Sequence, residues 1–397
     1  MNKWKLVRAA DFIDFNPRES LSKGTRAKKV GMERLQPFVR DIPSYEVATF
    51  NGGSKFRNGD TLMARITPCL ENGKTAKVDI LEDGEVGFGS TEFIVLREKT
   101  GVSNKDFIYY LAMSPILREK AIKSMVGSSG RQRVQQGVLN DIEFYAPPLD
   151  EQIEIGRTLR ALDDKIANNT AINHHLEQMA QAIFKSWFVD FEPWGGVMPS
   201  DWREVPLGEV MEISTKALNP QSCPDTILEH YSIPAFDETR LPIFELASEI
   251  KSNKYLVDKN SFLISKLNPV TKRIWRPYCI SEYAVCSTEF IVYRAKNPKH
   301  KDFYFSVVDS QAFTDFLLAH VTGSTGSRQR AIPSDTLSFP IATPTNEIIE
   351  DFCEKVASSY ALLEQNHLEN LKLRQMRDSL LPRLMSGVLS VSEVTAK

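Results

Sequence analysis

The sequence has few cysteines, and their arrangement excludes the structures that cysteines most often build. Among 397 residues there are five, at Cys69, Cys223, Cys279, Cys286 and Cys353, an odd number with no Cys-x-x-Cys pair. Scattered thiols of this kind predict neither a disulfide framework nor a zinc site, and they favour a reducing compartment. We therefore expect a cytoplasmic protein with no metal site.

Long apolar runs are also missing. No stretch approaches the roughly 18 apolar residues that a membrane span requires. The first fifteen residues, MNKWKLVRAADFIDF, lack the continuous apolar core of a signal peptide. We expect no segment that enters a membrane.

A large excess of either charge is absent. Lys and Arg number 49 against 51 for Asp and Glu, so the net charge of −2 excludes a uniformly basic nucleic-acid coat but leaves room for local basic patches. Hydrophobic residues make up 42% of the chain and charged residues 25%, which is ordinary for folded proteins and too apolar for disorder. The length predicts two to three domains.

The chain lacks the common motifs of nucleotide binding and of amino-group methylation. Gly73-Lys74-Thr75 has Pro68 where a phosphate-binding loop requires its first glycine. The segment at residues 146–149, APPL, lacks the asparagine and the aromatic ring of an Asn-Pro-Pro-aromatic methylation motif. We expect no nucleotide or methyl-donor cofactor in this chain.

One loose pattern of a metal-dependent nuclease is present. Asp225 is followed by Glu249 and Lys251, and two carboxylates with a lysine can hold Mg²⁺ and activate water. The pattern is common by chance and occurs in only one half of the sequence. A Mg²⁺-dependent nuclease that uses these three residues is the alternative to the function developed below.

The most informative feature of the sequence is an internal repeat. Ser90–Arg97 reads STEFIVLR and Ser287–Arg294 reads STEFIVYR, at an offset of 197 residues. The same offset relates the RQR at Arg131–Arg133 to the RQR at Arg328–Arg330. Between these points the two halves diverge, so one scaffold is repeated while the residues that it presents differ.

Each half predicts a globular head followed by a long helix. The heads, residues 1–148 and 197–344, alternate short β-type runs with turns and helical stretches such as 105–124 and 301–320, which predicts a mixed α+β fold. Proline clusters end the heads, and glutamate-rich helical sequence follows. We expect helical spacers at residues 149–196 and 345–397.

The two helical segments carry matching apolar seams with coiled-coil spacing. The first seam contains Ile155, Leu159, Leu162, Ile166, Asn169, Asn173, Leu176, Ala180, Ile183 and Trp187. An offset of 197 gives the second seam: Phe352, Val356, Ser359, Leu363, Asn366, Asn370, Leu373, Arg377, Leu380 and Leu384. About 38 helical residues correspond to a rod of roughly 57 Å.

Each seam is interrupted near its middle by two asparagines, which we expect to fix the register of the pair. Antiparallel pairing places Asn169 opposite Asn370 and Asn173 opposite Asn366. The seam alone also permits parallel pairing, but the symmetry of a duplicated chain favours the antiparallel arrangement, with an internal pseudo-twofold axis. The alternative is that each helix packs only on its own head.

Aromatic residues continue beyond the first seam, at Trp187, Phe188, Phe191 and Trp194. They either face a partner protein or cover the second head, and the sequence leaves both possibilities open.

Basic residues cluster within the heads. Residues 1–148 have a net charge of +5, whereas residues 149–199 have −4. The loops at 127–133 (GSSGRQR) and 323–330 (GSTGSRQR) place flexible backbone N–H groups beside Arg and Gln, which suits contacts to phosphates and to purine edges. Solvated surface loops are the alternative for any single residue. The candidate DNA-binding residues are Arg26, Lys28, Lys29, Arg65, Lys74, Lys77, Arg131, Gln132, Arg133, Lys266, Lys272, Arg273, Arg276, Arg328, Gln329 and Arg330.

Taken together, these motifs resemble the specificity subunits of type I restriction–modification systems. The resemblance rests on the duplicated STEFIV strand, the glycine-rich loops that end in RQR, and the PP-x-x-EQ segment at Pro147–Gln152. Two further segments, AIFKSWFVDFEP at Ala182–Pro193 and LLPRLMSG at Leu380–Gly387, are similar to the same family. One departure is that Glu347 alone remains of the EQ pair in the second half.

The resemblance implies a non-catalytic protein that recognises double-stranded DNA. Residues 1–148 and 197–344 would be target-recognition domains, each reading one half of a bipartite, asymmetric site. The helices would set the spacing of the half-sites and dock two methyltransferase subunits, with restriction subunits joining that core. S-adenosylmethionine, ATP and Mg²⁺ are then expected on the partner subunits of an adenine-N6 methyltransferase and endonuclease complex.

Overall fold

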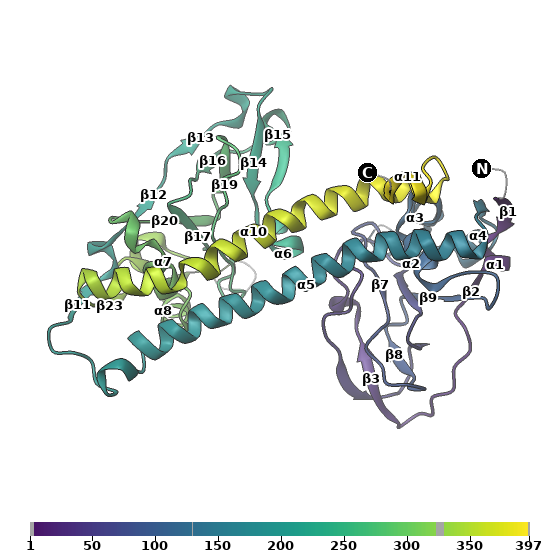
Figure 1. Cartoon of the computed structure of the whole chain (residues 1–397), viewed down its shortest axis with the longest axis horizontal. Helices are drawn as coiled ribbons and strands as arrows, with labels where there is room; N and C mark the ends of the chain where they lie inside the picture. The colour runs from purple at the N-terminus through teal and green to yellow at the C-terminus, as the bar shows by residue number, and fades with distance from the viewer. Residues whose placement is uncertain (1–3, 129, 323–328, 396–397) are drawn as a thin grey trace. The chain divides into compact units, whose positions relative to one another are not determined.

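The structure is a computed structural model that describes residues 4–128, 130–322 and 329–395 (Figure 1). The chain divides into two compact units. Unit 1 consists of Met1–Asn168 and Glu369–Lys397, and unit 2 consists of Asn169–Leu368. Both boundaries fall within long helices, so each unit contains a part of each helix.

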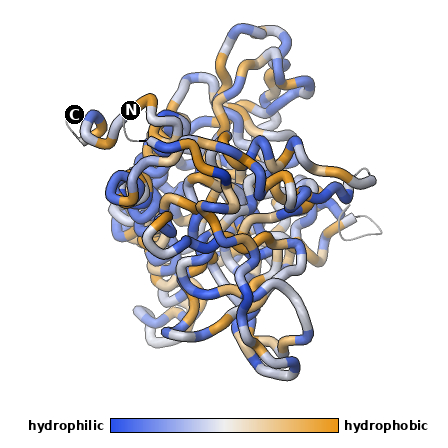
Figure 2. Tube along the Cα trace, turned by 90° about the vertical axis from the view of Figure 1, so that its right-hand side faces the viewer, coloured by the Kyte–Doolittle hydropathy of each residue, from blue (hydrophilic) through white to orange (hydrophobic). Residues whose placement is uncertain are grey.

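Hydrophobic and hydrophilic residues alternate at short intervals along the whole trace (Figure 2). Within the described part of the chain, no helix combines the length and the apolar character needed to cross a lipid bilayer. All five cysteines are free thiols, as the sequence predicts.

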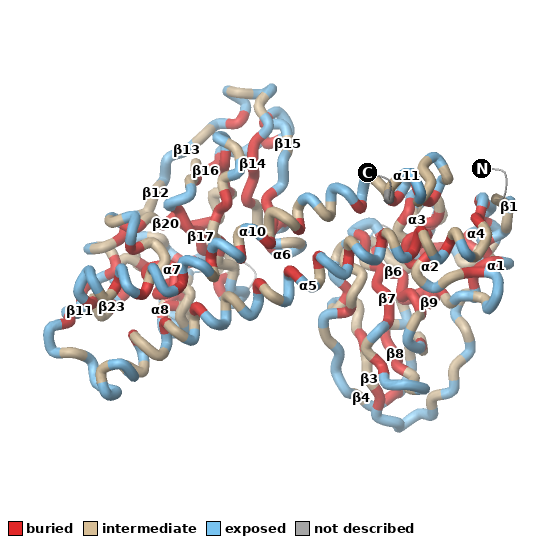
Figure 3. Tube along the Cα trace, in the orientation of Figure 1, coloured by how far each residue is buried: buried red, intermediate tan, exposed pale blue. Residues whose placement is uncertain are grey.

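Unit 1 contains a strand pair and two four-stranded sheets. β1 (Lys5–Arg8) pairs with β10 (Glu143–Ala146) and so joins the start of the head to its end. The first sheet has the order β2 (Ile13–Phe15), β9 (Phe93–Glu98), β6 (Thr61–Ala64) and β7 (Thr75–Lys77), and we call it the frame sheet. The second sheet has the order β4 (Glu46–Thr49), β3 (Arg26–Val30), β8 (Gly87–Gly89) and β5 (Ser54–Phe56). The frame strands β6, β7 and β9 are largely buried (Figure 3).

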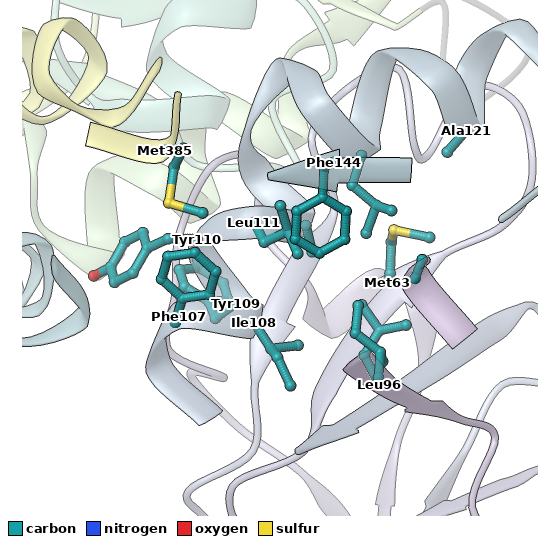
Figure 4. Close-up of a cluster of buried hydrophobic side chains, with 14 of the residues drawn as sticks. Met63, Leu96, Phe107, Ile108, Tyr109, Tyr110, Leu111, Ala121, Phe144 and Met385 are labelled. Carbon is teal, nitrogen blue, oxygen red and sulfur yellow. The ribbon is translucent and has the colours of Figure 1, made fainter. Parts of the chain in front are cut away.

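The helices of unit 1 pack on the frame sheet. They are α1 (Ala9–Phe12), α2 (Lys105–Met113), α3 (Pro115–Lys123) and α4 (Gln136–Asn140), with a 3₁₀ turn η1 (Met32–Arg34). The Asn104 side chain caps α2 by accepting from two backbone N–H groups. Figure 4 shows residues of α2 clustered with Phe144 of β10 and Met385 at the end of α10 (Asn346–Met385). The helical stretch predicted at 105–124 is thus two helices, because Pro115 cannot continue α2 and instead begins α3.

Unit 2 repeats this plan with additions. β11 (Arg203–Pro206) pairs with β23 (Pro340–Thr343), and the frame sheet has the order β12 (Met211–Ser214), β20 (Phe290–Ala295), β17 (Ser261–Ser265) and β18 (Ile274–Trp275). The second sheet has the order β13 (Ala217–Leu218), β16 (Lys254–Leu256), β19 (Ala284–Ser287), β14 (Ile227–Tyr231) and β15 (Ile243–Leu246). β21 (Val321–Thr322) pairs with β22 (Arg330–Ala331).

The helices of unit 2 are α6 (Ile233–Thr239), α7 (Lys301–Val308), α8 (Gln311–Ala319) and α9 (Pro333–Thr336). Short 3₁₀ turns are η2 (Glu192–Trp194), η3 (Leu207–Glu209), η4 (Pro220–Ser222), η5 (Ala247–Glu249) and η6 (Pro298–His300). The stretch predicted to be helical at 301–320 is again two helices, α7 and α8, and the side chain of Ser310 caps the second.

The structure confirms the internal repeat. The central strands β9 and β20 of the frame sheets come from the two STEFIV segments, and each lies between corresponding neighbours. In both second sheets one pair of strands is parallel, β3 with β8 and β14 with β19. Unit 2 adds the strand β13 at one edge, and its β14 and β15 are joined through α6, whereas β3 and β4 are joined through η1. The scaffold recurs, and the segments that it carries differ.

The two long helices are α5 (Leu149–Phe188) and α10 (Asn346–Met385), each of 40 residues, and α10 is followed by α11 (Val391–Thr395). They run antiparallel within each unit. In unit 2 the Asn366 side chain donates to that of Asn173 at 2.9 Å. In unit 1 Asn370 donates to the Ile166 carbonyl at 3.5 Å. Antiparallel pairing, which symmetry favours over the parallel alternative, is therefore confirmed.

The helices also form part of the core of each head, but because they pair with each other, the alternative that each packs only on its own head is wrong. In unit 1, Leu159 of α5 and Leu384 of α10 belong to the cluster that includes α2. In unit 2, Phe184 and Phe352 lie in the corresponding cluster around α7. Each helix therefore packs on the other helix and on a head within the same unit.

The aromatic residues at the end of α5 and just after it cover the head of unit 2. The ring of Trp194 lies 4.9 Å from that of Trp202, and Phe188 lies 5.8 Å from the same ring. Of the two possibilities left open by the sequence, the structure shows this one.

Candidate nucleic-acid interface

In unit 1 the RQR segment returns to the end of strand β6. The backbone of Arg133 forms bridges to Ile66 and Val126, and the Val134 N–H donates to the Arg65 carbonyl at 2.8 Å. Gln132 exchanges hydrogen bonds with Thr67 through its backbone. This segment and the first residues after β6 therefore lie side by side at one end of the frame sheet.

Glu92, two residues into the STEFIV segment, joins this arrangement through its carboxylate. Nε and Nη2 of Arg133 donate to Glu92 at 3.0 and 2.7 Å. Nε of Arg65 lies 3.9 Å from the same carboxylate. The Ser90 hydroxyl accepts from the Glu92 N–H and fixes the turn before the strand. We call Arg65, Glu92, Gln132 and Arg133 the RQR site of unit 1.

Unit 2 builds the same arrangement. Nε and Nη2 of Arg330 donate to the carboxylate of Glu289 at 3.1 and 3.3 Å. The Lys266 N–H donates to the Glu289 carbonyl, and the Lys266 carbonyl accepts from Ala331, both at 2.9 Å. Gln329 accepts through its backbone from Asn268. Lys266, Glu289, Gln329 and Arg330 form the RQR site of unit 2.

The pKa shifts at these sites follow the ion pairs. Hydrogen bonds from Arg133, against partial burial, hold the pKa of Glu92 below its usual value. Hydrogen bonding to Glu289 raises the pKa of Arg330. Both guanidinium groups remain open to solvent, with 44% of the Arg133 side chain and 49% of the Arg330 side chain exposed. Each site thus presents a charged, oriented guanidinium at the surface, which suits contacts to phosphates or base edges.

The remaining predicted residues of unit 1 are scattered, and several are engaged within the head. Lys28 donates to the Ile80 carbonyl and pairs with two glutamates, and Lys29 pairs with Glu46 at 2.7 Å. Lys74 donates to the Met32 carbonyl. Arg26 and Arg131 are exposed and make no side-chain hydrogen bond or ion pair with the residues that the structure describes.

Among the predicted DNA-binding residues of unit 1, Lys77 is turned inward. Only 8% of it is exposed, and its amine pairs with Asp106 of α2. Every residue of its strand, β7, is buried in the frame sheet. Lys77 therefore forms a structural ion pair beneath the surface of the head.

In unit 2 the basic residues around Trp275 are held by carboxylates. Lys272 pairs with Asp309, Arg273 with Asp237 at 2.6 Å, and Arg276 with Asp302 at 2.8 Å. The Arg276 guanidinium also lies 3.8 Å from the ring centroid of Tyr360. Arg328 lies outside the described residues.

Glu92 and Glu289 are the site residues that the search for basic clusters missed. Both stand at the third position of the repeated STEFIV segment, at the same offset of 197 residues as the RQR segments. That shared offset was the available signal, since two segments that recur together in a duplicated fold are candidates for contact.

The residues of the alternative nuclease pattern do not form a site. Asp225, Glu249 and Lys251 are exposed, and no hydrogen bond or ion pair joins them among the described residues. No group of three or more His, Cys, Asp or Glu side chains in the described ranges could hold a metal ion. The geometry gives no support to metal-dependent cleavage.

Comparison with known proteins identifies related sequences. A family model described as the type I restriction modification DNA specificity domain matches residues 1–178 and 199–373. The specificity subunit of the type I restriction enzyme HindI of Haemophilus influenzae is 26% identical, with 88% of this chain and 89% of the relative covered. The MjaIX specificity subunit of Methanocaldococcus jannaschii is 25% identical, with 75% and 71% covered.

Among solved structures, a type I restriction–modification S subunit from M. genitalium has a TM-score of 0.56 at 16% identity, with 96% of each chain covered. At that identity the likeness shows a shared fold.

Proposed function

The chain belongs to the type I restriction modification DNA specificity family, and from this premise we propose that it is the sequence-specific DNA-recognition subunit of a type I restriction–modification complex. The family model matches twice, once in each half of the repeat. Curated relatives that align over most of their length are named specificity subunits. Specificity subunits of this family are non-catalytic.

We propose that residues 1–148 and 197–344 each read one half of a bipartite, asymmetric site. The observation that carries this proposal is that both units have the same frame sheet but attach different segments to it. These segments include α6 and β13 in unit 2 and η1 in unit 1. A shared scaffold that presents different side chains suits two readers of unlike sequences. The basic, exposed RQR site recurs in both readers.

We propose that residues 149–196 and 345–397 act as spacers that set the distance between the half-sites and dock two methyltransferase subunits. Each helix has 40 residues, a rise of about 60 Å at 1.5 Å per residue. Hydrogen bonds join the antiparallel helices in both units, and in this proposal the seam asparagines fix the register. Such a pair is a stiff element, and stiffness is what a fixed half-site spacing requires.

The chemistry of the complex then belongs to its partners. We propose that adenine-N6 methylation with S-adenosylmethionine, and cleavage with ATP and Mg²⁺, take place on methyltransferase and restriction subunits. The free thiols of all five cysteines suit a reducing cytoplasm, where we place the complex. The nuclease alternative has no site to support it among the described residues.

We propose that only some of the candidate basic residues contact DNA. Arg133 and Arg330 of the RQR sites are exposed and held in place by glutamates, and Arg26 and Arg131 are exposed. Lys28, Lys29, Lys74, Lys272 and Arg273 reach DNA only by leaving their present partners. Lys77 and Arg276, which pair inside their heads, serve structural roles in this proposal.

The proposal is tested by mapping methylated adenines in the DNA of cells that carry the complete complex. We expect a two-part motif with an unspecified gap. Exchange of residues 1–148 for another recognition domain should change one half of the motif and leave the other intact. Insertion of whole helical turns into both spacers should change only the gap.

Two outcomes would overturn this function. A motif without two separable parts, or one whose halves both change on exchange of a single domain, contradicts independent reading. Mg²⁺-dependent cleavage by the purified chain alone, abolished by Asp225→Ala, would establish the nuclease alternative.

A further inference from the structure

The ion pairs Glu92–Arg133 and Glu289–Arg330 occupy corresponding positions in heads that otherwise differ. Their neighbours are not the same: Arg65 stands beside the first pair and Lys266 beside the second. The bonding pattern nevertheless agrees, because each carboxylate accepts from the Nε and Nη2 groups of its arginine. Two readers of unlike sequences thus keep one side-chain arrangement in common.

The mode of pairing leaves the end of each guanidinium available. A guanidinium carries five N–H donors, and the side-on bonds of Nε and Nη2 use one edge of the fork. The Nη1 group of Arg133 and that of Arg330 make no hydrogen bond with the described residues. The end of the fork, which binds a phosphate through two parallel hydrogen bonds, therefore remains unoccupied.

Each arginine is fixed at both ends. Its backbone lies between two neighbouring segments: Arg133 bridges Ile66 and Val126, and Arg330 bridges Leu267 and pairs with Thr322. Its guanidinium is held by a glutamate whose N–H is bound by a serine hydroxyl, Ser90 or Ser287. An arginine side chain has several rotatable bonds, so this arrangement removes conformational freedom before any ligand arrives.

What recurs in both heads should contact what both half-sites share. Half-sites of different sequence present different base edges, but every half-site presents phosphates. A side chain that reads a base would be expected to differ between the heads, as the attached segments do. The recurring arginines therefore fit the DNA backbone better than they fit base edges.

We propose that Glu92 and Glu289 are positioning residues that hold Arg133 and Arg330 for contact with one DNA phosphate in each half-site. This inference rests on the proposed function, since it presupposes that the heads bind DNA. The glutamates carry the wrong charge for contact with a phosphate, and in this proposal they act only through their arginines. If each glutamate–arginine pair had a purely structural role and only stabilised the local backbone, the variants would affect DNA binding differently.

The experiment measures DNA binding by the chain assembled with its methyltransferase subunits. The probes are a fluorescein-labelled duplex that carries the mapped site and a second duplex with the site scrambled. Equilibrium anisotropy over a series of salt concentrations gives the affinity and its salt slope. Variants are Arg133→Ala, Glu92→Ala and the double variant. Glu46→Ala is the control, because Glu46 also forms an ion pair with a basic residue, Lys29, in the same unit but outside the RQR site.

Arg133→Ala should weaken binding to both duplexes by about tenfold, as loss of a charge-assisted hydrogen bond does. It should also reduce the salt slope by about 0.9, as loss of one phosphate contact does. Glu92→Ala should weaken binding by roughly threefold to tenfold, because Arg133 must then be ordered on binding. Glu46→Ala, which removes the same charge, should leave binding unchanged or tighten it. Glu92→Ala should add nothing in the Arg133→Ala background.

Corresponding changes at Glu289 and Arg330 should behave alike and add to those in unit 1. Thermal unfolding of each variant, and the milder Glu92→Gln, separate loss of positioning from loss of folding.

Several results would overturn the inference. If Glu92→Ala tightens binding as Glu46→Ala does, the glutamate does not position the arginine. If Arg133→Ala weakens binding only to the mapped site and relaxes its preference at one base pair, the arginine reads a base. If no variant changes affinity while the parent binds the mapped site, the inference fails and the proposed function stands. If the parent complex shows no preference for the mapped site, the proposed function itself fails.

Discussion

The Asn366 side chain donates a hydrogen bond of 2.9 Å to the side-chain oxygen of Asn173, and both residues are almost fully buried between the two long helices of unit 2. The Asn173 amide donates in turn to the Leu363 carbonyl at 3.5 Å. A buried amide is costly when it lacks a partner, so a helix pair shifted by one turn would leave these groups unsatisfied. We therefore expect the pair to specify the register of the two helices.

Replacement of one member should be more harmful than replacement of both. Asn366→Leu leaves the buried Asn173 oxygen without its donor, and we expect a loss of about 1–3 kcal/mol in the free energy of unfolding. The double variant Asn173→Leu/Asn366→Leu should recover most of that loss while it weakens the preference for one register. Urea unfolding gives the free energies. Met179→Leu, at an exposed position of α5, is the control and should change stability by less than about 0.5 kcal/mol. Equal losses in the single and double variants would contradict this account.

Gly156 lets α5 approach the start of α2 closely. A Cβ at this position would lie 2.9 Å from Cβ of Asp106 and 3.2 Å from the backbone nitrogen of Phe107. Alanine normally stabilises a helix interior by about 1 kcal/mol relative to glycine. Here we expect Gly156→Ala to lower the thermal unfolding midpoint, because the contact outweighs that gain. Gly137→Ala in α4, where nothing lies within 4 Å, should leave the midpoint unchanged or raise it. An increase for Gly156→Ala would show that the two helices can separate without cost.

Much of the fold was predictable because it is duplicated. A single offset of 197 residues identified the strands β9 and β20 and the two seams, and the seam asparagines with the symmetry of the repeat predicted the pair Asn173–Asn366. These predictions depend on local patterns that the sequence repeats. The predicted helical stretches at 105–124 and 301–320 are each broken at a local signal, Pro115 in the first and the capping residue Ser310 in the second.

The candidate site was less predictable, because charge along the sequence does not give the direction of a side chain. Lys77 belongs to a basic cluster in sequence, yet its strand lies inside the frame sheet and its partner, Asp106, is 29 residues away. Arg276 likewise finds its aromatic partner, Tyr360, on a long helix far along the chain. Such contacts depend on tertiary packing.

His230 should make unit 2 sensitive to acid. The ring is 9% exposed, its Nδ1 lies 2.6 Å from Glu245, and burial lowers its pKa below the usual 6.5 although Glu245 opposes the shift. At a pH between the pKa of His230 in the folded chain and its higher pKa in the unfolded chain, the unfolded chain binds the proton more readily. The free energy of unfolding is therefore retained above about pH 6.5 and falls as the pH decreases below that value.

Urea midpoints at about pH 7.5 and about pH 5.5 should therefore differ more for the parent than for His230→Gln. We expect His230→Gln to be less stable than the parent at the higher pH, because glutamine does not fill the same space. The test is therefore the change in urea midpoint between the two pH values, not the midpoint itself. An equal loss on acidification in both proteins would assign the acid sensitivity to other groups.

Replacement of both members of the buried ion pair Asp163–Arg377 of unit 1 should cost less stability than replacement of one. Nη1 of Arg377 lies 2.8 Å from Asp163, the Tyr110 hydroxyl donates to the same carboxylate at 2.7 Å, and both charged residues are more than nine-tenths buried. Arg377→Met should cost about 3–5 kcal/mol, because it leaves an uncompensated charge in the core. Asp163→Leu/Arg377→Met should recover most of this loss, and addition of Tyr110→Phe should recover more by removing the orphaned hydroxyl.

In unit 2 the positions that correspond to Asp163 and Arg377 are Tyr360 and Ala180, both buried, and the Arg276 guanidinium lies against the Tyr360 ring. Hydrogen exchange of the α2 amides, measured with increasing urea, reports the stability of unit 1 separately from that of unit 2. If the double variant is as unstable as Arg377→Met, the ion pair contributes net stability of its own.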